Sequence, residues 1–476
     1  MHRTARRALA IALSAPLLVV ACATEGDPDV LGPRGEHPAA TGPPRGEAQG
    51  PPDDPRALAL AAVADVEGYW VETYPEIYGD AFEALGGYHP YGPDTPVPPC
   101  GDPPPTYEQI AENAFYCPPD DLIAWDEDAL VPRLADQFGA FTVGIVMAHE
   151  FAHAVQSRAG VTGRTIDLEL QADCFSGAWT AHVADGGSRV FAVDDEVLDA
   201  SVAGMIAISD APGTAEDDPL AHGSGFDRIG AFQEGFDGGA RWCAAAVDTP
   251  RETVEFGFTG SAAGAGAPGD MPLGDAGPDA PGLISVIEAD LNEFFAWLFD
   301  DVGDAWQPVE RIVLADPTVD EVTCGGDELA GGELRRVARY CAEENLVLLD
   351  GAGLVPDLYE IGDFAVASKI AGLWARSAQA QLGVGGDGVG GDGAADLQAD
   401  CLTGAWAAST FPDRPDVTPG TDLQISAGDL DESIMGFLTY RDDTPAGGAT
   451  VFERTDALRT GVLDGHRACE EFAPLG

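Results

Sequence analysis

The spacing of the cysteines constrains the fold of this chain more than any other feature. Setting Cys22 aside leaves eight of the nine cysteines, and these form two sets of four with nearly identical spacing. The first set is Cys100, Cys117, Cys174 and Cys243, and the second is Cys324, Cys341, Cys401 and Cys469. An even number of cysteines favours disulfides in an exported chain, although four cysteines permit three pairings and the repeated spacing does not choose among them. We favour Cys100–Cys117 with Cys174–Cys243, and the equivalent pairs in the second set.

The cysteine pattern belongs to a wider internal repeat. Residues 169–179 and 396–406 share most of their sequence, and residues 141–160 align without gaps to residues 364–383. Apolar residues recur at helical spacing in both members of these pairs. The sequence therefore predicts a tandem duplication, with two disulfides in each copy.

The N-terminal residues have the composition of a targeting signal. Three arginines precede an apolar run from Ala8 to Val20, which is too short for an ordinary transmembrane helix. The run ends beside Cys22, as in a bacterial lipoprotein signal. We therefore expect an exported protein that is anchored to the cell membrane by a lipid on Cys22. The alternative is a plain secretory signal with an incidental cysteine.

Composition divides the rest of the chain into segments. Residues 23–55 are rich in Pro, Gly and Asp and lack the apolar side chains needed to fold, so we expect a disordered tether. A second stretch, rich in Gly, Ala and Pro, has the composition of a linker. The predicted order is a signal peptide at 1–22, the tether at 23–55, a first domain at 56–250, the linker at 251–282 and a second domain at 283–476.

The charge of the chain restricts its partners. Asp and Glu number 81 against 24 Lys and Arg, which gives a formal net charge of −57. A surface this negative argues against nucleic acid and against docking on anionic lipid headgroups, since both need clustered basic side chains. High solubility is the simpler consequence of the charge, and adaptation to salt is an alternative. The sequence predicts no particular oligomeric state.

A short motif within the first copy suggests a metal site. His149 and His153 are four residues apart in a predicted helix, so their imidazoles share one face and can reach the same zinc ion. Glu150 lies between them, in the position of a base that acts on water at the metal. Two histidines leave a zinc ion short of the three protein ligands that catalytic sites commonly use.

Two carboxylates further along the chain fit the remaining roles. Glu169 follows His153 across a short turn at residues 160–163, and two antiparallel helices would bring it back to the histidines. Asp173 lies one helical turn beyond Glu169, where it can hold a ligand imidazole in the right tautomer. The competing interpretation makes Glu169 an ordinary surface glutamate.

These motifs resemble a known family. Residues 148–156 and the Glu-Leu-Gln-Ala-Asp-Cys block at residues 169–174 are similar to those of the bacterial neutral zinc metallopeptidases, and residues 115–118 and 222–224 also fit. The spacing of Glu169 and Asp173, downstream of the histidines, is like that of thermolysin-like gluzincins. The resemblance covers roughly residues 100–245. It implies one zinc ion bound by His149, His153 and Glu169 in a zincin-like unit, with Glu150 catalytic.

The expected reaction is hydrolysis of a peptide bond by a zinc-activated water, with Glu150 as general base. The substrate would be a protein, a peptide or a peptidoglycan stem. The reaction also needs a group that stabilises the oxyanion. Our candidate is His222, with Tyr116 as the second choice. The alternative interpretation of His222 is a loop histidine that makes a structural hydrogen bond.

The second copy lacks the metal motif. On the alignment, His149 corresponds to Gly372, Glu150 to Leu373 and His153 to Arg376, so zinc is expected in the first copy only. Asp396 and Asp400 remain, and carboxylates on a helix are usually solvated. A rival hypothesis follows from this loss. It holds that the chain is a non-enzymatic envelope protein that binds or scaffolds a partner, with a structural or vestigial metal site.

The coarse pattern predicts helix-dominated α+β units. Strand-like runs occur at residues 121–125 and 345–349, and the first is placed near the site, where an edge strand commonly holds an extended substrate. Apolar spacing predicts helices at residues 58–71, 131–158, 167–184 and 225–245.

Overall fold

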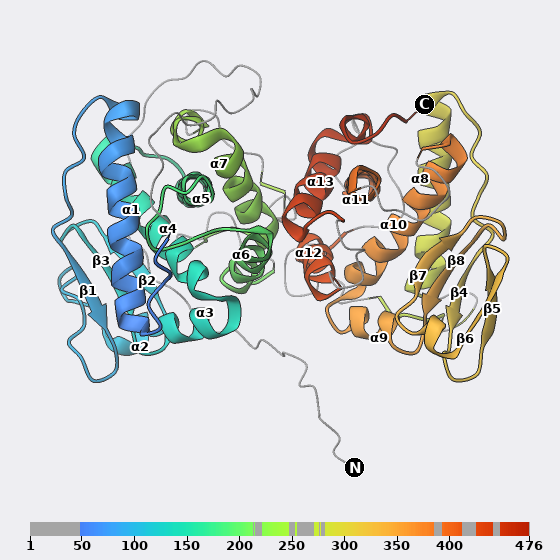
Figure 1. Ribbon diagram of the computed structural model, residues 1–476, viewed down its shortest axis with the longest axis horizontal. Coiled ribbons are helices and arrows are strands. Elements are labelled where there is room, and N and C mark those ends of the chain that lie inside the picture. The colour runs from blue at the N-terminus through green and yellow to red at the C-terminus, as the bar shows by residue number, and fades with distance from the viewer. Residues whose placement is uncertain are drawn as a thin grey trace, which may run out of the picture.

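The computed structural model describes residues 48–212, 214, 221–246, 253–254, 271–275, 277, 281–384, 393–411, 425–440 and 448–475. The predicted signal peptide, Cys22 and most of the tether and linker lie outside these residues. Within them, no helix combines the length and apolar character needed to cross a membrane. Two lobes lie side by side, one formed by α1 to α7 and the other by α8 to α13 (Figure 1).

The first lobe contains ten elements in a helix-rich order. They are α1 (Pro55–Tyr78), β1 (Gly87–Tyr91), α2 (Tyr107–Ile110), β2 (Ala114–Cys117), β3 (Leu122–Asp126), α3 (Leu130–Phe138), α4 (Ala140–Ala159), α5 (Thr165–Ala184), α6 (Asp195–Ala207) and α7 (Gly225–Ala246). The predicted helix-dominated α+β class is confirmed.

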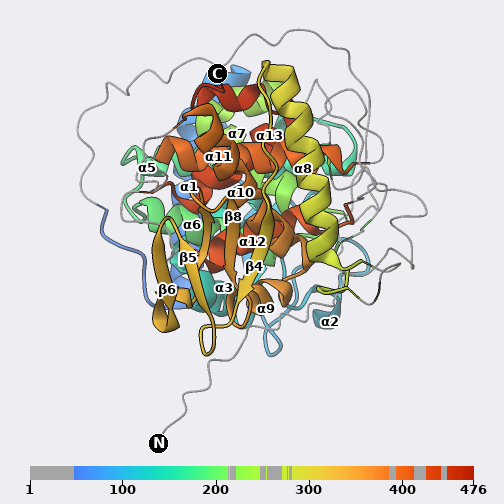
Figure 2. The ribbon, with the colours of Figure 1, turned by 90° about the vertical axis from the view of Figure 1, so that its right-hand side faces the viewer.

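The second lobe presents a closely similar order of elements. They are α8 (Leu283–Val302), β4 (Arg311–Ala315), β5 (Glu321–Cys324), β6 (Asp327–Ala330), β7 (Ala338–Cys341), β8 (Leu346–Asp350), α9 (Leu354–Tyr359), α10 (Asp363–Leu382), α11 (Gly393–Ser409), α12 (Asp429–Thr439) and α13 (Val451–Asp464). Figure 2 looks onto this lobe, with its strands toward the viewer and α12 and α13 behind them.

The two three-stranded sheets have the same topology. In the first sheet, β3 lies between β1, which is parallel to it, and β2, which is antiparallel. In the second, β8 lies between the parallel β4 and the antiparallel β7. The expectation of an edge strand at residues 121–125 is therefore wrong. Both edges of β3 are already paired, so β3 has no free edge for an extended substrate.

The predicted helices form, with one important break. A single helix was expected over residues 131–158, but α3 ends before Gly139 and α4 begins after it. Gly139 has a φ of 91°, a left-handed value that glycine adopts without strain and that stops a helix. The helix α1 begins at Pro55 and is capped by the carboxylate of Asp54, which accepts from the backbone N–H of Ala57.

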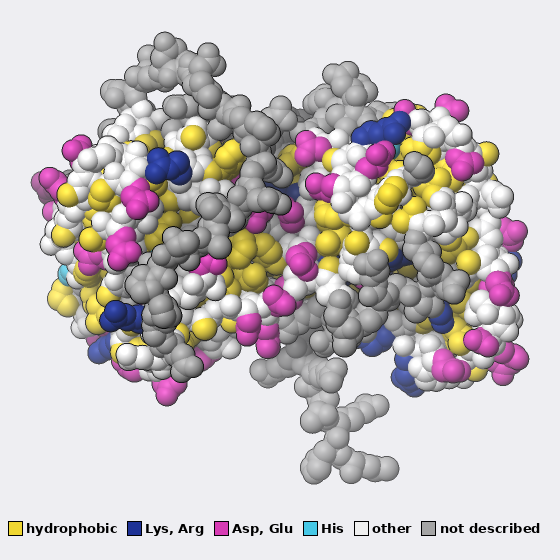
Figure 3. Space-filling model, turned by 45° about the horizontal axis from the view of Figure 1, so that its top comes forward, with side chains coloured by type: hydrophobic (Ala, Val, Ile, Leu, Met, Phe, Trp, Pro, Cys, Tyr) yellow, Lys and Arg dark blue, Asp and Glu magenta, His cyan; other side chains and the backbone are white. Residues whose placement is uncertain are grey.

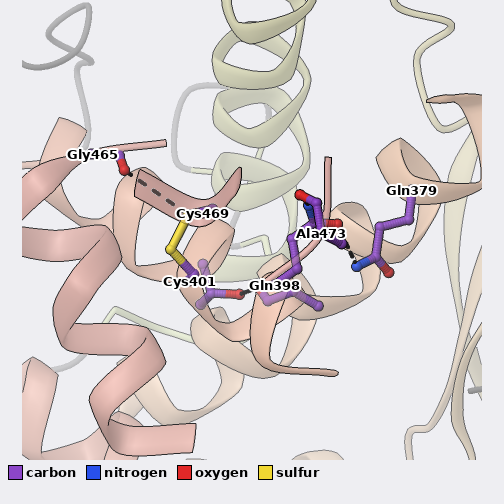
Figure 4. The surroundings of a disulfide bond; sticks show 8 residues. Gln379, Gln398, Cys401, Gly465, Cys469 and Ala473 are labelled. Carbon is purple, nitrogen blue, oxygen red and sulfur yellow. Dashed lines mark hydrogen bonds between the residues drawn. A yellow bond between two sulfur atoms is a disulfide. The ribbon is translucent and has the colours of Figure 1, made fainter. Parts of the chain in front are cut away.

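The four disulfides are the pairs favoured from the sequence. Cys100–Cys117 ties the segment between β1 and α2 to the end of β2, and Cys324–Cys341 ties the end of β5 to the end of β7. Cys174–Cys243 joins α5 to α7, and Cys401–Cys469 joins α11 to the segment after α13. Figure 4 shows the last of these beside a row of amide contacts from Gln379 to Gln398 and on to the carbonyl of Ala473.

Glycines let paired helices pack backbone against backbone in both lobes. A methyl group at Gly235 of α7 would overlap the carbonyl of Cys174, and one at Gly177 of α5 would overlap the carbonyl of Phe232. Gly404 and Gly461 make the equivalent contacts between α11 and α13. Each lobe thus has one helix pair that approaches too closely for any residue but glycine.

Acidic side chains are spread over the surface of both lobes. In the face shown in Figure 3, Asp and Glu are distributed over the two lobes, whereas Lys and Arg occur at few places. The core beneath is strongly aromatic, since Trp70, Trp125 and Trp179 are fully buried in the first lobe and Trp374 and Trp406 in the second. These side chains supply much of the apolar area removed from water on folding.

We predict that Gly235→Ala lowers the free energy of unfolding by about 3 kcal/mol, because the added methyl forces α5 and α7 apart. The control is Gly68→Ala in α1, where the new Cβ meets nothing within 4 Å. That change raises stability by roughly 0.5–1 kcal/mol, since glycine is the weaker helix former. Denaturant unfolding of both variants is the measurement. If the two changes altered the free energy of unfolding equally, the close contact between α5 and α7 would not limit which residue fits at position 235.

Candidate metal centre

Two antiparallel helices bring three potential ligands together. His149 and His153 lie on α4, and Glu169 lies on α5. Contacts between the helices run in opposite directions along the chain, with His149 beside Asp173 and Gln156 beside the carbonyl of Leu168. Gly160, in the left-handed conformation with a φ of 68°, ends α4 and allows the chain to reverse. The chain therefore reverses at residues 160–163, as predicted.

The separations of the donor atoms match a tetrahedral metal site. The Nε2 atoms of His149 and His153 are 3.2 Å apart, and the Glu169 Oε2 atom is 3.1 Å from the first and 3.5 Å from the second. Ligand bonds of about 2.0–2.1 Å place two ligands of a tetrahedral zinc ion about 3.3 Å apart. These three side chains form a group able to hold a metal ion. They are two nitrogens and one oxygen, a donor set that suits zinc.

Asp173 orients His149. Its Oδ1 atom lies 2.8 Å from Nδ1 of His149, so the imidazole donates there and presents Nε2 to the metal position. The Arg228 guanidinium in turn donates to both carboxylate oxygens of Asp173, at 2.8 and 2.9 Å. Asp173 is only 1% exposed and Arg228 3%. A buried charge pair with two parallel hydrogen bonds is geometrically rigid, so it holds the imidazole in one orientation.

Gln156 orients His153, a role that the sequence reasoning missed. The Gln156 Oε1 atom accepts from Nδ1 of His153 at 2.9 Å. Its Nε2 atom donates to the carbonyl of Leu168 and to Oε1 of Gln171. The sequence could have indicated this role, because Gln156 follows His153 by three residues in the same helix and residues three apart share a face. Arg228, the partner of Asp173, lies 55 residues away from it in the chain.

The site attracts positive charge. Burial lowers the pKa of the His149 imidazole, but the Asp173 and Glu169 carboxylates outweigh this effect and raise the pKa to about 10. Burial likewise opposes protonation of His153, and Glu169 raises its pKa above the usual value. Glu169 responds in the opposite sense, since His153 and His222 overcome burial and hold its pKa well below the usual range. The two buried carboxylates of Asp173 and Glu169 thus favour positive charge on the histidines beside them.

Glu150 stands beside this place in an apolar setting. It is 9% exposed, and burial raises its pKa despite the opposing charges of the two histidines. The backbone N–H of Tyr116, on edge strand β2, donates to its Oε2 atom at 2.8 Å. A carboxylate with a raised pKa accepts and returns a proton near neutral pH more readily than an exposed one.

The two candidates for oxyanion stabilisation lie differently. His222 is in the loop before α7, with Nδ1 3.4 Å from Oδ1 of Asp210, and its charge is among those that lower the pKa of Glu169. Tyr116 points its hydroxyl to Asp121, to which it donates at 2.9 Å. The tyrosine hydroxyl is therefore committed elsewhere, and only the backbone N–H of Tyr116 serves the site.

With this geometry established, comparison with known proteins becomes informative. Residues 98–245 match the model of the family described as "Putative neutral zinc metallopeptidase". That range includes His149, Glu150, His153 and Glu169, and it ends shortly after Cys243. It covers less than a third of the chain, and the second lobe lies outside it.

The curated relatives are themselves uncharacterized. YpfJ of Escherichia coli K12 is 30% identical over 156 residues, which covers 28% of this chain and 53% of the relative. Rv2575 of Mycobacterium tuberculosis H37Rv is 28% identical over 151 residues, or 26% of this chain and 52% of the relative. The chain therefore spans about half the length of the curated relatives it matches. No solved structure matches it significantly.

The corresponding place in the second lobe holds an ion pair. Arg376, on α10 where the alignment puts a histidine, pairs with Asp396 of α11 and donates to Gln379 at 3.0 Å. Asp400 is 5% exposed and receives two hydrogen bonds from Arg454, at 2.7 and 2.9 Å. The expectation that these carboxylates are solvated is therefore wrong for Asp400, which is buried. Asp396 is partly exposed, and each of the two carboxylates has an arginine partner.

A second group of carboxylates does not resemble a metal site. Asp363, Asp429 and Glu432 lie close together in the second lobe. The backbone N–H groups of Met271, Ser426 and Phe364 donate to them in that order. These carboxylates act as caps for chain segments, which accounts for their proximity.

We predict that the purified protein binds one zinc ion per chain and that Glu169→Ala abolishes stoichiometric binding, because the change removes one of three donor atoms. Asp396→Ala is the matched control, since it removes the corresponding carboxylate of the second lobe. That variant should keep one zinc ion. Metal content after dialysis measures both. Zinc retained by Glu169→Ala, or lost from Asp396→Ala, would overturn the ligand assignment.

Proposed function

We propose that the protein is a zinc metallopeptidase that hydrolyses peptide bonds at the His149–His153–Glu169 site. The observation that carries this proposal is the set of three donor atoms at tetrahedral separations beside Glu150, a buried carboxylate with a raised pKa. Three protein ligands leave the fourth position of a tetrahedral metal free, as in catalytic sites. The family match supports the same activity.

The proposed mechanism assigns a distinct task to each residue. A zinc ion bound here would lower the pKa of a water molecule and polarise the scissile carbonyl. Glu150 takes the proton from the attacking water and delivers it to the leaving amine, a double use that suits a carboxylate with a raised pKa. The N–H of Tyr116 holds one of its oxygens and so limits the carboxylate to one orientation.

The surrounding side chains keep the ligands in place. Asp173 and Gln156 each fix the tautomer of one histidine, so that both present Nε2 to the metal. His222 is our candidate for stabilising the oxyanion. Its support is its closeness to Glu169, whose pKa it lowers, and its position in a loop held to Asp210.

We further propose that the chain arose by tandem duplication and that only the first copy is active. Matching sheets, matching disulfide separations and matching helix pairs support the duplication. In the second copy, Arg376 pairs with Asp396 and Arg454 pairs with Asp400, and the two histidine positions are occupied by Gly372 and Arg376. Both carboxylates are therefore neutralised by arginine rather than by a metal.

Export and lipid attachment at Cys22 remain part of the proposal. Four disulfides favour an oxidising compartment outside the cytosol. A lipid on Cys22 would place the metal centre near the membrane surface, with peptides or proteins of the envelope as substrates. The strongly negative surface makes nucleic acid an unsuitable partner.

The test is a digest of a diverse peptide mixture by wild-type protein and by Glu150→Gln. We expect the variant to cleave about a thousandfold more slowly and to keep its zinc, because the change removes the proton acceptor but no ligand. Metal content measured on the same samples is the control.

Two outcomes would contradict the proposal. Cleavage by Glu150→Gln at the wild-type rate would exclude this mechanism. Zinc-loaded wild-type protein that cleaves no peptide would favour the rival hypothesis, a binding or scaffolding protein with a structural metal.

A further inference from the structure

The start of α7 is held by the second lobe. Asp431, on α12, accepts hydrogen bonds from the backbone N–H groups of Gly225 and Phe226, at 2.9 and 2.6 Å. Arg459, on α13, donates to the carbonyl of Phe226 at 2.6 Å, and its guanidinium lies 4.5 Å from the centre of the Phe226 ring. The second lobe thus binds both backbone N–H groups and a backbone carbonyl in the first turn of α7.

The contact is close because glycines line it. A Cβ atom at Gly230 would overlap the guanidinium of Arg459, and one at Gly225 would lie 3.0 Å from the Asp431 carboxylate. Arg459 is 8% exposed, and Asp431 is partly buried between the lobes. An enclosed contact with several hydrogen bonds allows little sliding of one lobe on the other.

The first turn of α7 also carries a residue that supports the metal centre. Arg228 lies two residues beyond Phe226, in the same turn of α7. Its guanidinium holds Asp173, which holds Nδ1 of His149. His222 lies three residues before Gly225, in the loop that enters the helix. A displacement of this turn would therefore move the support of a ligand histidine.

We propose that the second lobe positions the metal centre of the first, with Asp431 as a positioning residue that acts through α7, Arg228 and Asp173 on His149. This inference rests on the proposed zinc site and gives the metal-free lobe a task. Among the described residues, the group of potential ligands comes from the first lobe alone. The second lobe sets the place of the helix on which the support of His149 depends.

The interface offers a matched control, because an aspartate of the first lobe makes the same kind of contact with a helix of the second lobe. Asp199, on α6, accepts from the backbone N–H of Phe452 at the start of α13 at 3.0 Å. Gln233 of α7 donates to the carbonyl of Phe452 at 2.8 Å. Asp199 and Asp431 each stand five residues before a glycine of their helix. The Asp199 contact leads to Arg454 and Asp400, where no histidine is present.

The experiment compares Asp431→Ala with Asp199→Ala in the full chain. Zinc affinity is measured by chelator competition well below the unfolding temperature, and the cobalt(II)-loaded protein is examined for the visible absorption of tetrahedral coordination. We expect both changes to lower the unfolding temperature by similar amounts. Only Asp431→Ala should weaken zinc binding, on the order of fivefold, and alter the cobalt spectrum. Asp431→Asn keeps one of two acceptors and should fall between, which supplies a test if the alanine variant fails to fold.

The results separate the inference from the function on which it rests. Equal zinc affinities and equal cobalt spectra for Asp431→Ala, Asp199→Ala and wild type would overturn the positioning role while leaving the peptidase proposal intact. Equal weakening by both alanine changes would also overturn it, since a general loosening of the interface would then suffice. A wild-type protein without zinc would instead defeat the proposed function itself.

Discussion

The backbone-to-backbone packing of α5 on α7 determines where the parts of the metal centre lie. Gly177 and Gly235 allow the two helices to touch, and Cys174–Cys243 links them covalently. This closeness lets Arg228 of α7 reach Asp173 of α5 with two short hydrogen bonds. Asp173 then meets His149 across the α4–α5 contact. A looser pair of helices would leave a buried carboxylate and a buried guanidinium unpaired, at considerable free-energy cost.

The two lobes show how one framework accommodates two arrangements of charge. Both keep a buried aspartate held by an arginine of the helix after the next, in Asp173–Arg228 and Asp400–Arg454. Both keep a glutamine that bridges the paired helices, Gln156 and Gln379. The two lobes differ in the group that faces the carboxylate at the start of the second helix. The first lobe has two imidazoles beside Glu169, and the second has Arg376 beside Asp396. The second arrangement needs no metal to balance its carboxylates, which explains why the lobe folds without the histidines.

On our proposal that the second copy is inactive, the interface between the lobes gives that copy a structural role. Each lobe caps a helix of the other through an aspartate, and the carbonyl beside each capped amide is bound by Arg459 or Gln233. Such reciprocal contacts are those of a symmetric pair formed within one chain. A metal centre whose supporting helix is held from outside its own lobe depends on the partner lobe for its geometry.

Local spacing was enough to predict which side chains lie together at the candidate centre and much of the fold. The four-residue interval between His149 and His153, the later carboxylates and the paired cysteine spacings all reflect short-range geometry, which a sequence displays directly. Tertiary structure decided the rest. It placed β3 in the middle of its sheet, ended a helix at Gly139 and turned the Tyr116 hydroxyl away from the site. It also buried Asp400. It placed Arg228 against Asp173, and Asp431 against the start of α7, and on our proposal both support His149 from far away in the chain. Those contacts join residues tens to hundreds of positions apart, and only the packing of whole helices selects such partners.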